Sequence, residues 1–412
     1  MLARRTIDDL RDHEVAGRRA LVRVDYNVPL EGDAEERRVG SDVRIRATVP
    51  TLTALRERGA ILVLASHLGR PKGKRAPQFS LGPVARRLEE LLERRVAFLD
   101  EPFDERSRDL VRAAPAGAVI LLENLRFEPG EEKNDAELAG RLAAYGDFFV
   151  QDAFGTCHRA HASTVGVTRY LSPRVAGRLV ARELEAFRRL LEEPARPFVA
   201  ILGGAKIAGK LETLRGLAER CDFVALGGGM ANTFLAARGI PMGDSLVEED
   251  LLGEARELLE SFGDRLVLPA DAVAAREIGD AHEAGRGAET RVVATGDGVE
   301  EGWKVLDVGP RSVEAIDRAL SDARTVFWNG PLGVFETPPF DSATREVARR
   351  LADATRRGAY TVVGGGDSIA ALEEAGMLDE VSHASTGGGA ALELVSGAAL
   401  PGIEALDPAV DR

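Results

Sequence analysis

The sequence predicts an α/β protein of two lobes, each a parallel sheet flanked by helices in a Rossmann-like, doubly wound arrangement and joined by a hinge helix. Its 412 residues suffice for two or three domains that each bury a core. Short runs that are apolar throughout alternate with amphipathic stretches along the whole chain, a pattern typical of parallel strands covered on both faces. A charged helical stretch separates two such series.

The predicted strands of the first half are 20–24, 60–65, 96–99, 119–122 and 148–150. A helix is predicted over 81–94, where apolar residues recur at three- and four-residue steps. The second half repeats the scheme with strands at 198–202, 223–226, 266–268, 325–328 and 360–363. Because ligands of parallel sheets bind beyond the carboxyl ends of the strands, we expect functional residues directly after these runs.

The boundary between the lobes is expected at 181–193, a charged helix with a partial apolar stripe that Pro194 and Pro197 close. The same pattern also suits an ordinary surface helix. We therefore predict an N-terminal domain over 1–180, an interdomain helix over 181–194 and a C-terminal domain over 195–390. The tail after Ala390 carries too many apolar residues to be a free end.

Composition narrows the class of function. A net charge of −13 argues against nucleic-acid or anionic-membrane partners, whereas an anionic small substrate is compatible if cations gather locally in a cleft. Two cysteines, Cys157 and Cys221, suit a reducing compartment rather than a disulfide framework. The sequence shows no signal peptide and no apolar run of membrane-spanning length, so a soluble cytoplasmic protein is expected.

Glycine clusters follow four of the predicted strands in the second half. They are Gly203-Gly204, 227–229, 329–333 and 364–368, and a fifth at 386–389 precedes a short helical pattern. Glycine lets backbone come close to a nucleotide, and the N-terminus of a following helix presents N–H groups to phosphates. Asp367 could hold Mg²⁺ together with phosphate oxygens, or could cap the next helix.

Two lysines stand four residues apart after the strand at 198–202. Only six of the 54 cationic Lys and Arg residues are lysines, so Lys206 and Lys210 are conspicuous. We expect them on one helix face, where both ammonium groups reach the same phosphate region, although a glycine-rich turn with two solvated lysines is an equal alternative.

Two familiar nucleotide motifs are nearly matched here and are rejected. Leu211 stands where a P-loop needs a Ser or Thr hydroxyl for Mg²⁺. Asn232 stands where the dinucleotide fingerprint needs its closing glycine. Neither a Ras-like NTPase nor a Rossmann dehydrogenase is supported.

Cations of the first half collect in segments after strands. They are Arg44, His67 and Arg70 in 66–71, Arg126 in 123–127, and Arg159 in 156–161. Guanidinium forks bind carboxylate or phosphate at two points, although each cation alone is more often solvated or locally paired. Asp25 and Asn27 could contact substrate hydroxyl groups or simply form the turn before Pro29. Together these residues suggest a receptor for a small, multiply charged acid.

In their order, these segments resemble phosphoglycerate kinase, and the similarity covers nearly the whole chain. The matching blocks are 23–29, 66–71, 123–127, 152–161, 203–210, 227–235, 326–336, 364–368 and 385–389. The resemblance implies reversible phosphoryl transfer between 1,3-bisphosphoglycerate and ADP, giving 3-phosphoglycerate and ATP, a step of glycolysis and gluconeogenesis. It implies a monomer whose lobes close about a hinge, and a tail, 391–412, that packs back on the N-terminal domain.

The resemblance also implies site residues. Phosphoglycerate would be bound by Asp25, Asn27, Arg44, His67, Arg70, Arg126 and Arg159. The nucleotide would be bound by Gly204, Lys210, Gly228, Gly229, Asn329, Pro331, Gly333, Glu336, Gly365, Gly366, Asp367 and Ser368, with Glu336 on the ribose and Asp367 on Mg²⁺. The phosphoryl group in transfer would be surrounded by Arg44, Lys206, Gly387, Gly388 and Gly389.

The expected reaction needs no dedicated base, since the attacking atom is an ADP oxygen or an ionised carboxylate, and alignment with charge compensation suffices. One departure from the family pattern concerns the lysine pair: Gly209 stands where an acidic residue is usual. Gln151, Tyr26 and Cys157 are milder departures. Two other functions are compatible with the sequence: a carboxylate kinase for a different small acid, and a nucleotide-binding regulatory protein without turnover.

Overall fold

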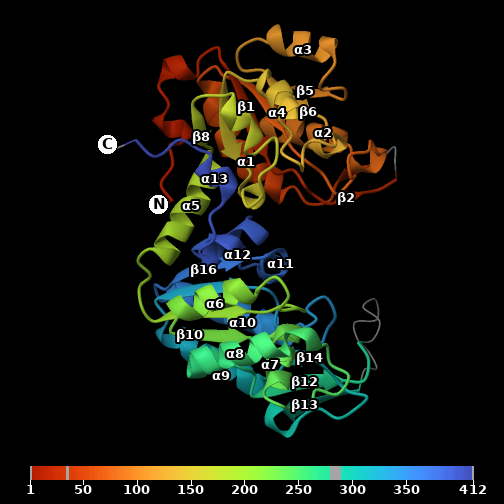
Figure 1. Cartoon of the computed structure of the whole chain (residues 1–412), viewed down its shortest axis with the longest axis vertical. Helices are drawn as coiled ribbons and strands as arrows, with labels where there is room; N and C mark the ends of the chain where they lie inside the picture. The colour runs from red at the N-terminus through yellow and green to blue at the C-terminus, as the bar shows by residue number, and fades with distance from the viewer. Residues whose placement is uncertain (1, 34–36, 279–288, 411–412) are drawn as a thin grey trace. The chain divides into compact units, whose positions relative to one another are not determined.

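A computed structural model describes residues 2–33, 37–278 and 289–410. The chain forms two compact units (Figure 1). The N-terminal unit comprises Met1–Glu185 and Ala399–Arg412, and the C-terminal unit comprises Ala186–Ala398. The division falls inside helix α5 (Arg178–Leu191), which covers most of the segment expected as an interdomain helix.

The N-terminal unit is built on a six-stranded parallel sheet of order β5-β6-β4-β1-β7-β8. Its strands are β1 (Arg19–Val24), β4 (Ile61–Ala65), β5 (Val96–Leu99), β6 (Val119–Leu122), β7 (Phe148–Asp152) and β8 (Arg174–Ala176). Its helices are α1 (Val43–Glu57), α2 (Gly82–Leu92), α3 (Glu105–Arg112), α4 (Ala136–Ala143) and α13 (Pro401–Glu404). All five strands predicted for this half are confirmed, and β8 was not predicted.

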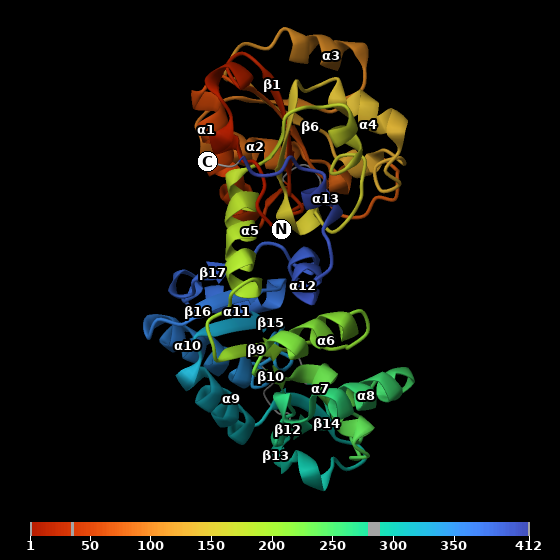
Figure 2. The same ribbon diagram turned by 60° about the vertical axis from the view of Figure 1, so that its left-hand side comes forward.

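Continuous apolar character explains why these segments form the middle of the sheet. Every residue of β4, β6 and β7 is buried, as expected for strands covered on both faces. Val22, Leu62 and Leu121 belong to a core that α1 and α2 cover. Figure 2 shows α1 and α4 on opposite sides of this sheet. A short hairpin of β2 (Leu30–Glu31) and β3 (Arg38–Val39) precedes α1.

The C-terminal unit contains a second six-stranded parallel sheet, of order β11-β10-β9-β15-β16-β17. Its strands are β9 (Phe198–Leu202), β10 (Phe223–Leu226), β11 (Leu266–Val267), β15 (Thr325–Asn329), β16 (Tyr360–Gly364) and β17 (His383–Ala384). The helices are α6 (Leu211–Arg220), α7 (Gly228–Ala237), α8 (Leu252–Phe262), α9 (Pro310–Asp322), α10 (Ser342–Arg356), α11 (Gly366–Glu374) and α12 (Gly389–Ser396). In Figure 2, α9 and α10 lie on one side of the sheet and α6, α7 and α8 on the other.

A three-stranded antiparallel sheet in the C-terminal unit was not predicted. It consists of β13 (Thr290–Ala294), β12 (Asp271–Ala275) and β14 (Lys304–Val308), in that order. Its middle strand is largely alanine, and β13 is largely solvent-accessible. Neither strand carries the strong apolar run by which the parallel strands are recognised.

Buried polar groups fix the start of α5 within the N-terminal unit. Asp152, fully buried, accepts hydrogen bonds from the backbone N–H groups of Leu179 (3.0 Å) and Val180 (3.3 Å). Thr51 Oγ1 accepts from the Arg178 N–H at 2.8 Å. Gly177 is required beside them, because a Cβ there would lie 2.2 Å from Asp152 Oδ1.

The chain's last described segment, 399–410, completes the N-terminal unit. Asp407 pairs with Arg174 of β8 at 2.6 Å, and its carbonyl accepts from the Arg5 N–H at 3.0 Å. The Gly402 N–H donates to the Cys157 carbonyl at 2.9 Å, and a Cβ on Gly402 would come 2.9 Å from Cys157 Cα. This segment joins the unit from Ala399, whereas the tail was expected to begin at 391.

No helix among the described residues is both long and apolar enough to cross a membrane.

Candidate active site

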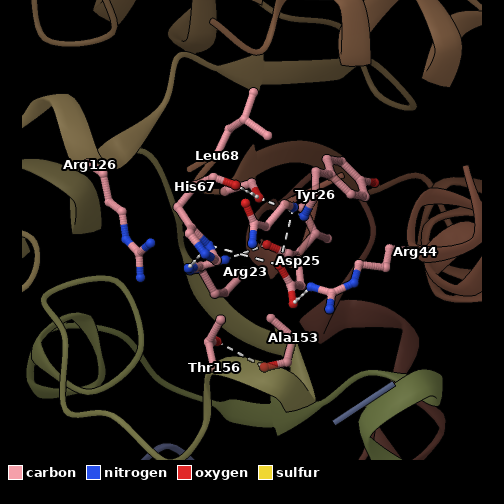
Figure 3. Close-up of polar contacts among 12 residues, drawn as sticks. Arg23, Asp25, Tyr26, Arg44, His67, Leu68, Arg126, Ala153 and Thr156 are labelled. Carbon is pink, nitrogen blue, oxygen red and sulfur yellow. Dashed lines mark hydrogen bonds and ion pairs between the residues drawn. The ribbon is translucent and has the colours of Figure 1, made fainter. Parts of the chain in front are cut away.

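The expected acid-binding residues of the N-terminal unit gather at one edge of its sheet. Asp25 follows β1, His67 follows β4 and Arg126 follows β6, and these three strands are neighbours in the order β6-β4-β1. Because they are parallel, their carboxyl ends meet. Figure 3 shows Arg44, from the first turn of α1, directed at Asp25, and His67 beside Arg23.

Direct contacts hold this cluster in place. Arg44 Nη1 donates to Asp25 Oδ2 at 2.6 Å (Figure 3). Asn27 Oδ1 accepts from the Gly69 N–H at 2.8 Å, and Arg126 Nη1 donates to the Gly69 carbonyl at 2.7 Å. Asp25 Oδ1 also accepts from the Asn27 N–H at 3.2 Å, so the turn that was the alternative role for these two residues is present as well.

A buried network beneath the cluster was missed by the sequence analysis. Arg23 is 1% exposed and donates from Nε to Ser163 Oγ at 2.8 Å, while its Nη2 lies 3.2 Å from His67 Nδ1. Ser163 Oγ in turn donates to Glu131 Oε1 at 2.5 Å. Glu131 therefore supplies the buried negative charge that accompanies the buried Arg23 guanidinium.

Burial and neighbouring cations keep the histidines of this site neutral. Burial first, and then the charges of Arg23 and Arg126, hold the pKa of His67 well below its usual range. The same causes lower the pKa of His161 to about 4. At neutral pH both rings therefore offer hydrogen bonds and no charge, and the cationic charge of the site comes from arginine.

The three other arginines expected at this site differ in exposure and in their contacts. Arg126 is 7% exposed and lies 3.4 Å from Glu132, yet its buried Nε has no hydrogen-bond partner among the described residues. Arg159 is exposed and donates from Nε to His158 Nε2 at 3.0 Å. Arg70 is exposed in the loop after β4. Guanidinium groups with donors to spare suit an anionic ligand.

The C-terminal unit holds a cavity of about 480 Å³ at the carboxyl ends of β9, β10, β15 and β16. Seven residues expected to bind nucleotide line it: Gly204, Gly228, Gly229, Pro331, Gly333, Glu336 and Asp367. Lining residues that were not expected include Asn232, Asp244, Leu246, Ile278, Lys304, Leu306 and Val334. Lys304 could have been found, because it is one of only six lysines; the apolar residues carry no such signal.

Backbone packing explains several glycines of this rim. A Cβ on Gly203 would lie 2.0 Å from the Pro331 carbonyl oxygen, and one on Gly228 would lie 2.6 Å from that of Gly204. Gly228 also has φ +65°, in the left-handed region that glycine enters at no steric cost. The loops after β9, β10 and β15 thus touch one another through backbone, which leaves room for a ligand over them.

The lysine pair departs from expectation. Helix α6 begins at Leu211, so Lys206 and Lys210 both precede it and do not share a helix face. The cause is Gly209, whose φ of +74° cannot continue into a helix, and the chain instead turns with Lys210 N–H donating to the Ile207 carbonyl at 2.8 Å. Lys206 is exposed, while Lys210 Nζ donates to the Gly203 carbonyl at 3.1 Å. Burial lowers the pKa of Lys210, and the charge of Asp367 opposes this.

Other expected residues lie beside the cavity rather than on its wall. Ser368 is buried and accepts from the Gly330 N–H at 2.7 Å. Asn329 is buried, and its Nδ2 has no hydrogen-bond partner in the described structure. Gly387 and Gly388 precede α12, whose first residue is Gly389. The Gly387 N–H donates to Ser385 Oγ at 3.1 Å, so the N–H groups that the start of the helix offers are those of Gly388 and Gly389.

Asp367 is the residue of this site that suits a metal. It lies in the first turn of α11 behind Gly365, which takes the N-cap position, so the capping alternative for Asp367 is wrong. The described residues contain no group of three His, Cys, Asp or Glu side chains arranged to hold a metal ion. Mg²⁺ commonly binds one or two carboxylates and completes its shell with phosphate oxygens and water, which fits a single aspartate in a nucleotide cavity.

Comparisons with known proteins agree with this geometry. A family model described as Phosphoglycerate kinase matches residues 10–398. The phosphoglycerate kinase of Chloroflexus aurantiacus is 49% identical over 405 residues, covering 97% of this chain and 98% of that one. That of Synechococcus elongatus is 47% identical over 411 residues, covering 99% and 100%. A solved phosphoglycerate kinase from Coxiella burnetii superposes with a TM-score of 0.84 at 38% identity, covering 98% of both chains.

Proposed function

The chain belongs to the phosphoglycerate kinase family and catalyses reversible phosphoryl transfer between 1,3-bisphosphoglycerate and ADP, and we propose that each unit binds one of these substrates. Neither a kinase for a different acid nor a regulatory nucleotide-binding protein is supported by relatives that match at 47–49% identity over nearly the full length.

The N-terminal unit is proposed to bind the phosphoglycerate. Asp25 and Asn27 contact its hydroxyl group, while His67, Arg70, Arg126, Arg159 and Arg44 receive its charged groups. The excess of guanidinium groups supports this role, since an acid without a remote phosphate would leave several of them without a counter-charge. The buried network of Arg23, Ser163 and Glu131 positions the strand ends from which these side chains project.

The C-terminal unit is proposed to bind ADP or ATP in the cavity of about 480 Å³, a volume in the range of small-molecule sites. The apolar side chains of Leu246, Ile278, Leu306 and Val334 suit the adenine base. Glu336 binds the ribose hydroxyl groups, and Gly204, Lys210 and Asp367 lie toward the phosphates. Seven residues that the family resemblance implied meet in this one cavity, and this is the observation that carries the proposal.

Transfer itself rests on charge compensation. An ADP oxygen attacks the acyl phosphate in one direction, and an ionised carboxylate attacks the γ-phosphate of ATP in the other, so no side chain has to remove a proton. Lys206, Arg44 and the N–H groups of Gly388 and Gly389 offset the charge of the moving phosphoryl group, and bound Mg²⁺ would neutralise phosphate oxygens beside Asp367. Direct transfer requires the two bound substrates to meet in line and water to be excluded. We place the enzyme in the reducing cytoplasm, where its two free, buried cysteines are stable, and propose that it acts as a monomer.

Lys206→Ala tests the assignment. Because Lys206 is exposed and acts mainly on the charge in transfer, kcat should fall about 10²- to 10³-fold with little change in either KM. The assay supplies ATP and 3-phosphoglycerate and follows NADH oxidation through a coupled dehydrogenase. Lys133→Ala, which removes an exposed lysine of the N-terminal unit, is the control and should retain full activity. A near-wild-type kcat for Lys206→Ala contradicts the role, and a rate that survives removal of Mg²⁺ contradicts the metal.

A further inference from the structure

We propose that the N-terminal unit carries a second anion site, distinct from the candidate active site, that binds a small phosphate anion of two or more negative charges. The site is a cavity of about 650 Å³. Its walls come from residues 37–42, which include strand β3, from Arg46 in the first turn of α1, and from helix α2. Its volume lies in the range of small-molecule binding sites.

The charge of the lining is opposite to that of the protein. Five arginines line the cavity (Arg37, Arg38, Arg46, Arg86 and Arg87). Asp42 and Glu90 are the two carboxylates of the lining, so five positive charges less two negative ones leave an excess of three. The chain as a whole carries −13. Such a local reversal concentrates anions in the cavity.

Two of the arginines are held by Asp42, and this fixes the geometry of the wall. Arg87 donates to Asp42 Oδ2 from Nε at 2.8 Å and from Nη2 at 2.6 Å. Arg46 Nε donates to Asp42 Oδ1 at 2.8 Å. Asp42 precedes α1 but its side chain makes no capping hydrogen bond, since both oxygens are engaged by guanidinium groups. Arg46 thereby keeps its terminal nitrogens for a ligand.

The other three arginines lack a close carboxylate. Arg86 Nη2 donates only to the Arg37 backbone carbonyl, at 2.9 Å. Arg38 is 3.8 Å from Glu31, and that pair is largely exposed. Within residues 2–33, 37–278 and 289–410, no ion pair is present for Arg37 or Arg86. Arg86 is therefore held by one backbone carbonyl and keeps further donors for a ligand. Guanidinium groups without a close counter-charge suit the oxygens of a phosphate.

Most of the lining of this cavity is distinct from the candidate active site, although Arg37 also lines a neighbouring cavity of about 310 Å³ that Asn27 and Gly69 line. None of Asp25, Asn27, Arg44, His67, Arg70, Arg126 or Arg159 lines it. Arg44 stands two residues after Asp42, a rotation of roughly 200° around an α-helix, so it points to the opposite side. There it pairs with Asp25. The acid and the second anion are therefore recognised by different faces of the first turn of α1.

Titration calorimetry of the full chain with inorganic pyrophosphate tests the proposal. Saturating 3-phosphoglycerate and a non-hydrolysable ATP analogue are present, so both substrate sites are filled. Wild type should bind one pyrophosphate per chain, more weakly as salt is raised, because the contacts are exposed. Arg37→Gln combined with Arg86→Gln should weaken binding at least tenfold, since it removes the two arginines that lack an ion pair.

Arg94→Gln combined with Arg95→Gln is the matched control. Arg94 and Arg95 are exposed just beyond the end of α2 and do not line the cavity. Their replacement by glutamine removes the same two positive charges as the Arg37→Gln and Arg86→Gln pair. The control should bind pyrophosphate as wild type does. The control and Arg86→Gln alone should keep kinase activity, since Arg86 does not line the cavity beside Asn27. Should the first double variant fold poorly, Arg86→Gln alone is measured and should still weaken binding several-fold. An absence of saturable binding, or equal weakening in both double variants, overturns the proposal.

Discussion

The two candidate substrate sites are built on opposite principles. In the N-terminal unit, side chains from several elements hold one another, as Arg44 holds Asp25 and Arg23 joins Ser163 to His67. In the C-terminal unit the rim is mostly backbone, packed so closely at Gly203 and Gly228 that no side chain fits. A small acid of high charge is recognised through fixed guanidinium groups, whereas a nucleotide needs a surface it can lie against and N–H groups for its phosphates.

The difference implies different vulnerabilities. A site made of side chains depends on buried charges that must stay paired. Loss of one partner leaves the other charge buried and uncompensated, which destabilises the residues that hold the site. A site made of backbone depends on close packing and on glycine dihedral angles. It is therefore disrupted when a substitution adds a Cβ atom. The following predictions test that distinction, beginning with the largest expected effect.

Glu131→Gln should destabilise the N-terminal unit by about 3–5 kcal/mol, because the buried Arg23 loses its counter-charge. Burial raises the pKa of Glu131, while the Arg23 charge and the Ser163 hydrogen bond oppose the shift. The measurement is urea unfolding, with KM for 3-phosphoglycerate as a second readout that should rise more than KM for ATP. Glu137→Gln, which alters an exposed carboxylate of α4, should leave both unchanged. Equal stability of the two variants would show that the network is not needed.

The two units share one pH-sensitive feature, a buried aspartate at the start of a helix. Asp152 accepts from N–H groups of α5, and Asp307 Oδ2 accepts from the Ala343 N–H of α10 at 3.0 Å. Burial is the largest cause that raises the pKa of each to about 7, from 3.8. Between these values the unfolded chain has lost a proton that the folded one keeps. Stability is therefore greatest below the unfolded pKa and falls as pH rises, by about 1.4 kcal/mol per pH unit for each group.

Asp152→Asn and Asp307→Asn should each remove one such pH dependence, since asparagine cannot ionise. Asp152→Asn keeps the single oxygen that accepts from Leu179 and Val180. Asp307→Asn loses one of two accepted hydrogen bonds, from Val308 or Ala343, and so carries an added cost that does not vary with pH. The free energy of unfolding is measured at pH 5 and pH 7. Relative to wild type, each variant should be more stable at pH 7 than at pH 5. Asp147→Asn is the control: the Arg19 hydrogen bond lowers the pKa of Asp147, so its titration falls below this window. Curves that run parallel to wild type would contradict the assigned titrations.

The smallest effects concern two glycines of the C-terminal unit. Gly203→Ala should cost about 1–3 kcal/mol and raise KM for ATP, because its Cβ must displace the Pro331 carbonyl. Gly209→Ala has open space around the new Cβ and only a φ of +74° to accommodate, so it should cost about 1 kcal/mol. Thermal unfolding and nucleotide KM measure both. An unaltered KM in Gly203→Ala would contradict the view that backbone contact shapes the rim.

The same contrast governs what the sequence could predict. The glycine clusters follow apolar strands, so one stretch of sequence carries both the element and its site, and six residues of these clusters line one cavity. The partnership of Arg23 with Ser163 and Glu131 joins three distant segments, and no local pattern records it. The strands β12 and β13 were missed because alanine and accessible polar residues give no apolar run. The helical placement of Lys206 and Lys210 was wrong because spacing alone does not reveal that Gly209 is left-handed.

The segment 399–410 has a consequence for how the protein is made. Residue 399 leaves the ribosome after the whole C-terminal unit, 214 positions beyond residue 185, a delay of roughly 10 to 40 seconds at bacterial and eukaryotic synthesis rates. During that interval Arg174 has no Asp407 and the Cys157 carbonyl has no Gly402. The first unit to be synthesised is therefore the last to be completed.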